Sequence, residues 1–128
     1  MDKLKTYTDS RGNLTIVEKG KEIPFSIERA YWIHGVPEGE ERGKHANKIS
    51  YQYLIAVNGS VDIILEDKNG RHTHHLNSKD KGLLVPPLTW NELVNFSNDA
   101  VLLVFASHSY DTQTYINSYD EFLQYIGK

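Results

Sequence analysis

The sequence predicts an all-β antiparallel barrel or jelly roll with a short C-terminal helix. Roughly eight or more short segments alternate apolar and polar residues, and turn residues separate them about every ten residues. The last segment instead spaces its apolar residues as in a helix. With 128 residues, the chain is expected to form one domain, 1–128, whose core is large enough to fold without disulfides.

The composition excludes several classes of protein. The formal net charge of −3 gives no general attraction to nucleic acid or to an anionic membrane, so an anion site must be a local cluster of cations. There is no cysteine, which excludes disulfides, thiolate metal sites and a cysteine nucleophile. No apolar run approaches the ~20 residues of a membrane span, and none follows the N-terminus as in a signal peptide. We therefore expect a cytoplasmic protein.

The first third of the chain predicts a turn and two strands. Asp9–Gly12 has turn residues, and Leu14–Val17 is a candidate strand. A longer strand opens at Ile23-Pro24-Phe25, and its alternation places Arg29 and Tyr31 on one face. An arginine beside a tyrosine is either a buried ligand contact or an interface or edge residue.

Two Asn-Gly pairs mark turns in the middle of the chain. Asn58-Gly59 lies between the alternating segments Tyr51–Val57 and Val61–Glu66, which predicts a type I′ hairpin. Asn69-Gly70 then turns the chain into a strand at Arg71–Leu76.

Further strands are expected at Leu83–Val85, Leu88–Leu93 and Val101–Ala106, the last covered on both faces because it is continuously apolar. A helical stripe of apolar residues runs from Tyr115 to Ile126. Ser118, three residues before Glu121, resembles a capping box, so the helix is expected to begin there.

The segment from residue 42 to residue 48 contains the side chains best suited to bind a ligand or to transfer a proton. If residues 45–57 form one strand, His45 and Asn47 share a face with Tyr51 and Tyr53. Such a face, with cations near its rim, suits a pocket for an anionic polar ligand. The alternative is a loop-to-strand junction whose charges are solvated.

Motifs along nearly the whole chain resemble those of one family. They are Asp9-Ser10-Arg11-Gly12, Ile23-Pro24-Phe25-Ser26-Ile27-x-Arg29-x-Tyr31, Arg42-Gly43-x-His45-Ala46-x-Lys48, Asn58-Gly59-Ser60, Trp90-x-Glu92, and Tyr110-Asp111 through Tyr119-Asp120 to Tyr125-Ile126. In order and spacing they resemble the cupin-fold sugar-nucleotide 3,4-ketoisomerases, which act on dTDP-4-keto-6-deoxyglucose. No single motif carries the resemblance.

The resemblance implies a cupin barrel and acid–base chemistry without a metal or other cofactor. A base removes the proton at sugar C3, an enediol forms, the proton returns at C4, and a second group moves a proton between the two oxygens. The product would be a dTDP-3-keto-6-deoxyhexose for the biosynthesis of 3-aminosugars and surface polysaccharides such as lipopolysaccharide. The resemblance also implies a homodimer whose subunits exchange N-terminal strands.

The chain departs from the family at two histidines. The first of the family's histidine pair matches His45, but the second falls at Asn47, and a later family histidine falls at Asn91. An amide can hydrogen-bond but cannot shuttle a proton near pH 7. Either His45 works with water or a tyrosine, or Asn47 and Asn91 hold the substrate oxygens as donors, or the reaction has been lost. We expect the catalytic residues to be His45 and Asn47.

No metal site is expected. Cupin metal sites generally use two histidines one residue apart, a carboxylate and a later histidine, and Asn47 and Asn91 stand at two of these places. Amides are poor ligands for transition metals. The cluster His72, His74 and His75 is expected to lie on an exposed hairpin strand.

The substrate diphosphate requires cations, and arginine suits it through its forked donors. The candidates are Arg42, Arg29, Arg11 near a subunit interface, and the weaker Lys48.

Tyr51 and Tyr53 are expected beside His45, because the pleat turns the intervening residue away. Trp90 either walls the sugar or fills the core, and Asn91 is a further contact. Glu92 either hydrogen-bonds His45 and sets its tautomer or meets a surface lysine.

The sequence leaves three functions open: the isomerase, a non-catalytic sugar-nucleotide-binding paralogue, and an epimerase of the same ketosugar.

Overall fold

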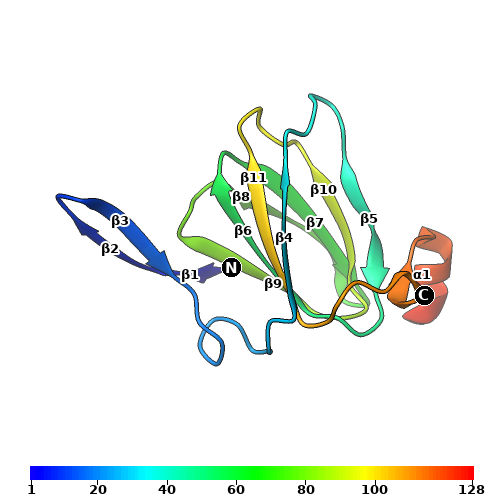
Figure 1. The fold of residues 1–128 in the computed structure, drawn as a ribbon. Helices are drawn as coiled ribbons and strands as arrows, with labels where there is room; N and C mark the ends of the chain where they lie inside the picture. Colours follow the sequence, from blue (N-terminus) through cyan, green and yellow to red (C-terminus); the bar gives the residue numbers. More distant parts are fainter.

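The chain folds as a jelly roll of two antiparallel sheets, which confirms the predicted fold class. In this computed structural model, which describes residues 1–128, a hairpin projects from one side of the barrel and a helix lies at the opposite side (Figure 1). The first sheet has the order β1 (Asp2–Lys3), β9 (Lys81–Val85), β6 (Gln52–Asn58), β11 (Val101–Ala106), β4 (Arg29–His34). The second has the order β12 (Tyr115–Ile116), β5 (Arg42–Asn47), β10 (Trp90–Val94), β7 (Val61–Asp67), β8 (Gly70–Leu76).

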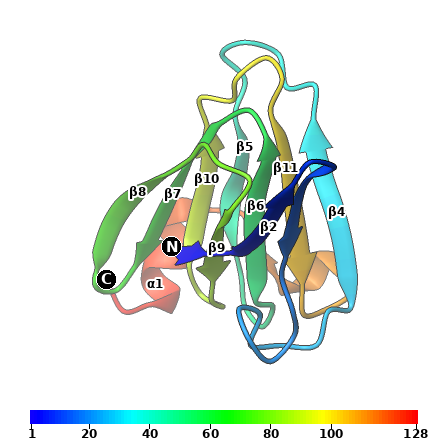
Figure 2. The same cartoon turned by 90° about the vertical axis from the view of Figure 1, so that its left-hand side faces the viewer.

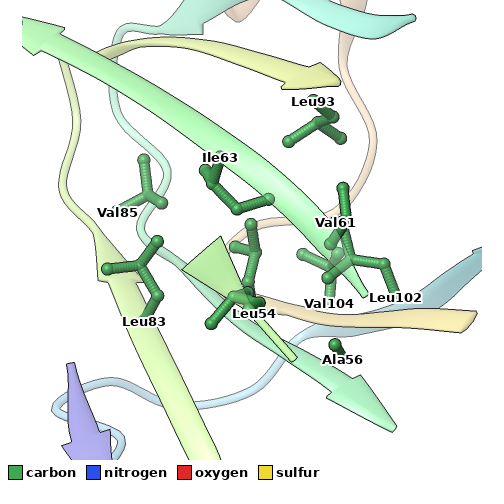
Figure 3. Close-up of a cluster of buried hydrophobic side chains, with 10 residues drawn as sticks. Leu54, Ala56, Val61, Ile63, Leu83, Val85, Leu93, Leu102 and Val104 are labelled. Atoms are coloured by element: carbon green, nitrogen blue, oxygen red, sulfur yellow. The ribbon is translucent and has the colours of Figure 1, made fainter. Parts of the chain in front are cut away.

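The main core lies between the two sheets. Leu54 and Val104 of the first sheet pack with Ile63 and Leu93 of the second, within a cluster of ten buried apolar residues (Figure 3). Burying each such side chain stabilises the fold by about 1.5–3 kcal/mol relative to exposure. In β11 one face is buried and the other half-buried, as expected for a continuously apolar strand. Packing in this core therefore fixes the position of one sheet relative to the other, and the barrel stays open on the side where β4 and β5 do not pair.

The N-terminal hairpin, β2 (Lys5–Asp9) and β3 (Gly12–Ile16), stands apart from the barrel (Figure 1). Its apolar side chains are exposed, with 57% of Tyr7 and 57% of Leu14 accessible. At the barrel itself, β4 is an edge strand, and Figure 2 shows it on the opposite side from β8. Within a single chain, therefore, no other residues cover the apolar side chains of the hairpin, and no further strand pairs with the outer edge of β4.

The two Asn-Gly pairs behave differently. The predicted type I′ hairpin at Asn58-Gly59 is wrong, because β6 and β7 belong to different sheets and only the glycine has a positive φ, 65°. This turn carries the chain across the core from one sheet to the other. Asn69-Gly70 does close a paired hairpin, in which Asp67 of β7 pairs with Gly70 of β8.

Residues 45–57 form two strands in different sheets and not one. The chain bends at Lys48 and Ile49, between β5 and β6. Asn47 holds this bend, since its Oδ1 accepts the backbone N–H groups of Ile49 at 2.9 Å and Ser50 at 2.7 Å. The alternation of side chains therefore restarts at β6.

The helix α1 (Tyr119–Tyr125) begins where the sequence predicts. Ser118 Oγ accepts the backbone N–H of Glu121 at 3.2 Å, as in a capping box. The apolar stripe upstream of this cap is not helical, because Tyr115 and Ile116 form β12 and pair with β5. No helix in the structure is both long and apolar enough to cross a membrane.

Candidate active site

A cavity of about 610 Å³ lies between β4 of the first sheet and β5 of the second. These two strands do not pair, so this side of the jelly roll is open. Polar side chains from five strands line the cavity, namely Arg29, Tyr31, Arg42, His45, Gln52, Asn91 and Tyr115. A volume in this range is typical of a site for a small molecule.

A β-bulge at the start of β5 shapes one wall. Asn91 pairs with His45 but Glu92 pairs with Gly43, so Lys44 has no partner on β10. Gly43 and Lys44 both have positive φ values, 82° and 62°. A Cβ on Gly43 would lie 2.7 Å from Asn91 Oδ1, so this position requires glycine. The bulge lets Gly43 and His45 line the cavity while Lys44 pairs outside it with Glu41.

His45 is a half-buried imidazole on the cavity wall. Burial lowers its pKa below the ordinary histidine value, so the ring is neutral at pH 7 and able to accept a proton. The ring meets the ring of Tyr115 edge-on, with centroids 4.8 Å apart. Asn91 Nδ2 donates to the backbone oxygen of His45 at 3.1 Å, which ties β10 to β5 at this point.

Arg29 places a positive charge inside the cavity. Its guanidinium lies over the rings of Tyr31 and Tyr110, at 5.0 and 5.4 Å from their centroids. Its Nη2 donates to Tyr115 Oη at 3.3 Å, whereas its buried Nε has no hydrogen-bond partner. The two aromatic rings therefore hold the guanidinium of Arg29 in place, and its Nε–H donor has no partner within the chain.

Tyr31 and Gln52 add neutral polar groups to the wall. Gln52 Nε2 donates to Tyr31 Oη at 3.3 Å. Burial is the main cause that raises the pKa of Tyr31, to about 12, so its hydroxyl remains protonated at neutral pH. The cavity thus combines a neutral base, cations and the protonated hydroxyl of Tyr31, which suits proton transfer on an anionic substrate.

Four of the residues predicted from the sequence line this cavity: His45, Arg29, Arg42 and Asn91. The predicted partnership of His45 and Asn47 on one wall is wrong, because Asn47 does not line the cavity. Besides holding the bend, it donates from Nδ2 to Thr114 Oγ1 at 3.0 Å.

The predicted placement of Tyr51 and Tyr53 beside His45 is also wrong. The bend after β5 reverses the expected faces, so Gln52 faces the cavity. Tyr53 is fully buried on the other side of the sheet, in a cluster with Leu4. Tyr51 is 40% exposed outside the cavity.

Trp90 and Glu92 lie on the opposite face of β10 from Asn91. Trp90 fills the core beneath the helix, which was one of its two interpretations. The interpretation that Glu92 hydrogen-bonds His45 is wrong, because Glu92 accepts hydrogen bonds from Trp90 Nε1 at 2.9 Å and from Arg71 Nη2 at 2.9 Å. It also lies near the exposed Lys44: burial acts to raise the pKa of Glu92, but the two hydrogen bonds and the charge of Lys44 help to lower it.

Two predicted cations lie outside the cavity within the single chain. Arg11 is at the tip of the projecting hairpin, where it pairs with Asp9 at 2.7 Å. Lys48 lies over the ring of Tyr125, with its Nζ 5.5 Å from the centroid. The expected role of Arg11 near a subunit interface stays a prediction.

Tyr115 and Gln52 are two cavity residues that the sequence does not predict. The apolar spacing assigns Tyr115 to the helical stripe, although the cap at Ser118 places it before the helix. The pleat assigns Gln52 to the opposite face, because the bend after Asn47 has no signal in the pattern of apolar residues.

Comparisons with known proteins agree on one family. The family described as FdtA, WxcM-like, C-terminal, matches residues 1–127. The TDP-4-oxo-6-deoxy-α-D-glucose-3,4-oxoisomerase of Aneurinibacillus thermoaerophilus is 45% identical over 124 residues, which cover 97% of this chain and 89% of that protein.

Solved structures extend the likeness to the fold. A 3,4-ketoisomerase from Helicobacter canadensis has a TM-score of 0.94 at 40% identity, covering 98% of this chain and 95% of its own. QdtA, a sugar 3,4-ketoisomerase from Thermoanaerobacterium thermosaccharolyticum in complex with TDP, has a TM-score of 0.93 at 39% identity, covering 98% and 91%. A histidine-to-asparagine variant of QdtA has been solved with TDP-4-keto-6-deoxyglucose.

Proposed function

The chain belongs to the FdtA family of WxcM-like proteins, and we propose that it is an isomerase that converts dTDP-4-keto-6-deoxyglucose to a dTDP-3-keto-6-deoxyhexose in deoxysugar biosynthesis. The observation that carries this proposal is the neutral imidazole of His45 on the wall of a cavity that also holds the guanidinium of Arg29. Enolisation of a ketone needs a base of this kind close to groups that stabilise an oxyanion.

The proposed reaction uses His45 as the carbon base. Its neutral ring removes the proton from C3, whose bonding electrons form the C3=C4 double bond as the C4 carbonyl oxygen gains a proton. The resulting enediol loses the proton from its C3 oxygen while His45 returns a proton to C4. Both carbons and both oxygens then balance, and the imidazole is neutral again.

Arg42 and Arg29 are the proposed diphosphate contacts within the chain. Arg42 is exposed at one end of the cavity wall and Arg29 is half-buried on the opposing strand. Their forked donors can each bind two phosphate oxygens in a planar, bidentate geometry that a lysine ammonium lacks. Asn91, with its amide nitrogen already bonded to the backbone, can still accept from a sugar hydroxyl through Oδ1.

We also propose that the protein works as a homodimer whose subunits exchange N-terminal strands. The exposed apolar side chains of the hairpin and the edge strand β4, with 61% of Trp32 accessible, support this assembly. An exposed sheet edge is a template for strand pairing, and exchange of an identical element is a low-cost route to a dimer. Arg11 would then reach the partner's cavity.

One experiment tests the proposed function. The protein is incubated with dTDP-4-keto-6-deoxyglucose in D₂O and followed by NMR, with His45→Asn as the matched variant. We expect a 3-keto product from the native protein and a loss of about 10²- to 10⁴-fold in the variant. An epimerised 4-ketone would indicate an epimerase instead, and saturable binding without exchange would indicate a non-catalytic binding protein.

A further inference from the structure

The second sheet carries a buried carboxylate that the proposed reaction does not use. Glu66 of β7 is 5% exposed. It pairs with Trp90 of β10, whose side chain packs beneath the helix, so Glu66 lies on the outer face of the sheet, away from the main core. A buried charge is costly unless hydrogen bonds compensate it, so the partners of Glu66 show what this carboxylate holds in place.

Two side chains from different elements compensate the charge of Glu66. Arg71 Nη1 of β8 donates to Glu66 Oε1 at 2.8 Å, and the hydroxyl of Tyr119 lies 2.9 and 2.8 Å from the two carboxylate oxygens. Arg71 also donates to Glu92, so its guanidinium is fixed on both sides. The hydrogen bond to Glu66 is the main cause that raises the pKa of Tyr119, so the phenol keeps its proton and donates it to the carboxylate.

Tyr119 stands where the cavity wall meets the helix. Tyr115 of β12 and Asn117 line the cavity, and α1 begins at Tyr119, shortly after them. The strand β12 is two residues long and pairs with β5 alone. Because so short an edge strand makes few hydrogen bonds of its own, this wall depends on how firmly the start of the helix is attached to the sheet.

We propose that Tyr119 and Glu66 are positioning residues that form a latch, whose hydrogen bond holds the start of α1 on the sheet and thereby keeps the β12 wall of the cavity in place for the substrate. The inference rests on the proposed ketoisomerase function for the identity of that substrate. Neither residue lines the cavity. The latch therefore sets the fraction of molecules with a complete cavity and takes no part in the proton transfers.

The latch can open from the solvent side without disturbing the carboxylate. Tyr119 is 40% exposed. A hollow of about 430 Å³ lies beside its side chain and is also lined by Arg71 and Glu92. Water can replace Glu66 as the hydrogen-bond partner of the phenol, while Glu66 stays paired with Arg71. The open and closed states then differ by few contacts, as expected for a local opening.

The latch model makes a specific kinetic statement. If the substrate binds only when the wall is in place, its apparent affinity falls with the closed fraction, whereas saturating substrate draws every molecule into the closed state. A weakened latch should therefore raise KM and leave kcat unchanged. By reciprocity, a ligand in the cavity should protect the wall from opening.

Tyr119→Phe removes the hydroxyl of the latch and keeps the ring that meets Trp90 edge-on at 5.3 Å. We expect amide hydrogen exchange of residues 115–117 to accelerate about 10- to 100-fold, because a hydrogen bond to a charged acceptor is lost. Exchange in β11, within the main core, should stay at the native rate. Tyr125→Phe is the matched control, since it removes the same atom at the other end of α1 from a half-exposed ring.

Steady-state kinetics with dTDP-4-keto-6-deoxyglucose test the link to the cavity. For Tyr119→Phe we expect KM to rise while kcat stays within about twofold of the native value. Tyr125→Phe should match the native protein in both constants. Addition of TDP should slow the exchange of residues 115–117 in the native protein and in Tyr119→Phe.

Three results would overturn the latch. The first is exchange of residues 115–117 in Tyr119→Phe no faster than in Tyr125→Phe. The second is equal acceleration in β11, which would indicate general destabilisation. The third is a fall in kcat at unchanged KM, which would place the effect of Tyr119 in the transition state. If the native protein converts no ketosugar, the proposed function fails, whereas the exchange comparison still shows whether the latch holds the wall.

Discussion

Asn91 binds the backbone oxygen of His45 through its side-chain amide at 3.1 Å, directly across the bulge that separates β5 from regular pairing with β10. The base of the proposed reaction is therefore held in place by a side chain that itself lines the cavity. The close approach of the two strands depends on the missing side chain of Gly43.

Gly43→Ala should disturb this arrangement by more than backbone strain alone. The added Cβ would lie 2.7 Å from Asn91 Oδ1, and overpacking of this kind costs ~1–3 kcal/mol. Gly39→Ala is the matched control, because Gly39 has the same φ of 82° and no atom near the added Cβ. We expect denaturant unfolding to show a larger loss of stability for Gly43→Ala, together with reduced activity. Equal losses in both variants would show that the contact with Asn91 is unimportant.

Asn47 should matter for stability and not for the chemistry. Asn47→Ala leaves the backbone N–H groups of Ile49 and Ser50 without their acceptor, which costs about 1–3 kcal/mol. Asn47→His should likewise lower the melting temperature without raising kcat, because the position does not reach the cavity. Asn69→Ala, at an exposed hairpin, serves as the control for both. An increase in kcat with Asn47→His would place this residue back in the catalytic machinery.

The burial of His45 predicts a specific dependence of stability on pH. Its pKa is lowered in the folded protein, so the unfolded chain binds this proton more readily. As the pH falls through the ordinary histidine range, the free energy of unfolding should decrease, and the neutral base should be lost only below that range. His45→Asn should remove part of this decrease when urea unfolding is compared at pH 7.5 and pH 5.5. An identical pH dependence in both proteins would exclude His45 as its source.

Mixing two inactive variants tests the proposed exchange of hairpins. If Arg11 serves the partner's cavity, a heterodimer of Arg11→Ala and His45→Asn contains one native site, formed by His45 of one subunit and Arg11 of the other. Refolding the two variants together in equal amounts should restore about a quarter of the native activity, since half of the dimers carry one good site of two. Activity that stays at the level of the separate variants would argue against sharing of the site between subunits.

Local rules account for much of this structure. Alternation alone placed Arg29 and Tyr31 on the same face of β4, and the cap at Ser118 located the start of the helix. The sheet to which a strand belongs is a tertiary property, however. Asn58-Gly59 has the sequence of a hairpin turn, but the jelly roll uses it to cross between sheets.

The cavity was harder to predict because two backbone irregularities define it. The side chain of Asn47 bends the chain and reverses the faces of β6, so Gln52 replaces the expected tyrosines. The bulge at Lys44 places a non-glycine residue at positive φ. A lysine gives no indication of this backbone conformation in the sequence. Tyr115 joins the wall only through its pairing with a strand some seventy residues earlier (Tyr115 with Asn47), a contact that no local pattern encodes.

That late strand separates the main core from the completed cavity. All ten buried residues of the main core between the sheets lie between Leu54 and Val104, so β12 contributes nothing to that core. The wall that carries Tyr115 is instead held by a separate small cluster, in which Phe122 of the helix packs on Trp90. Loosening of this cluster would therefore open one side of the cavity while leaving the packing between the two sheets intact.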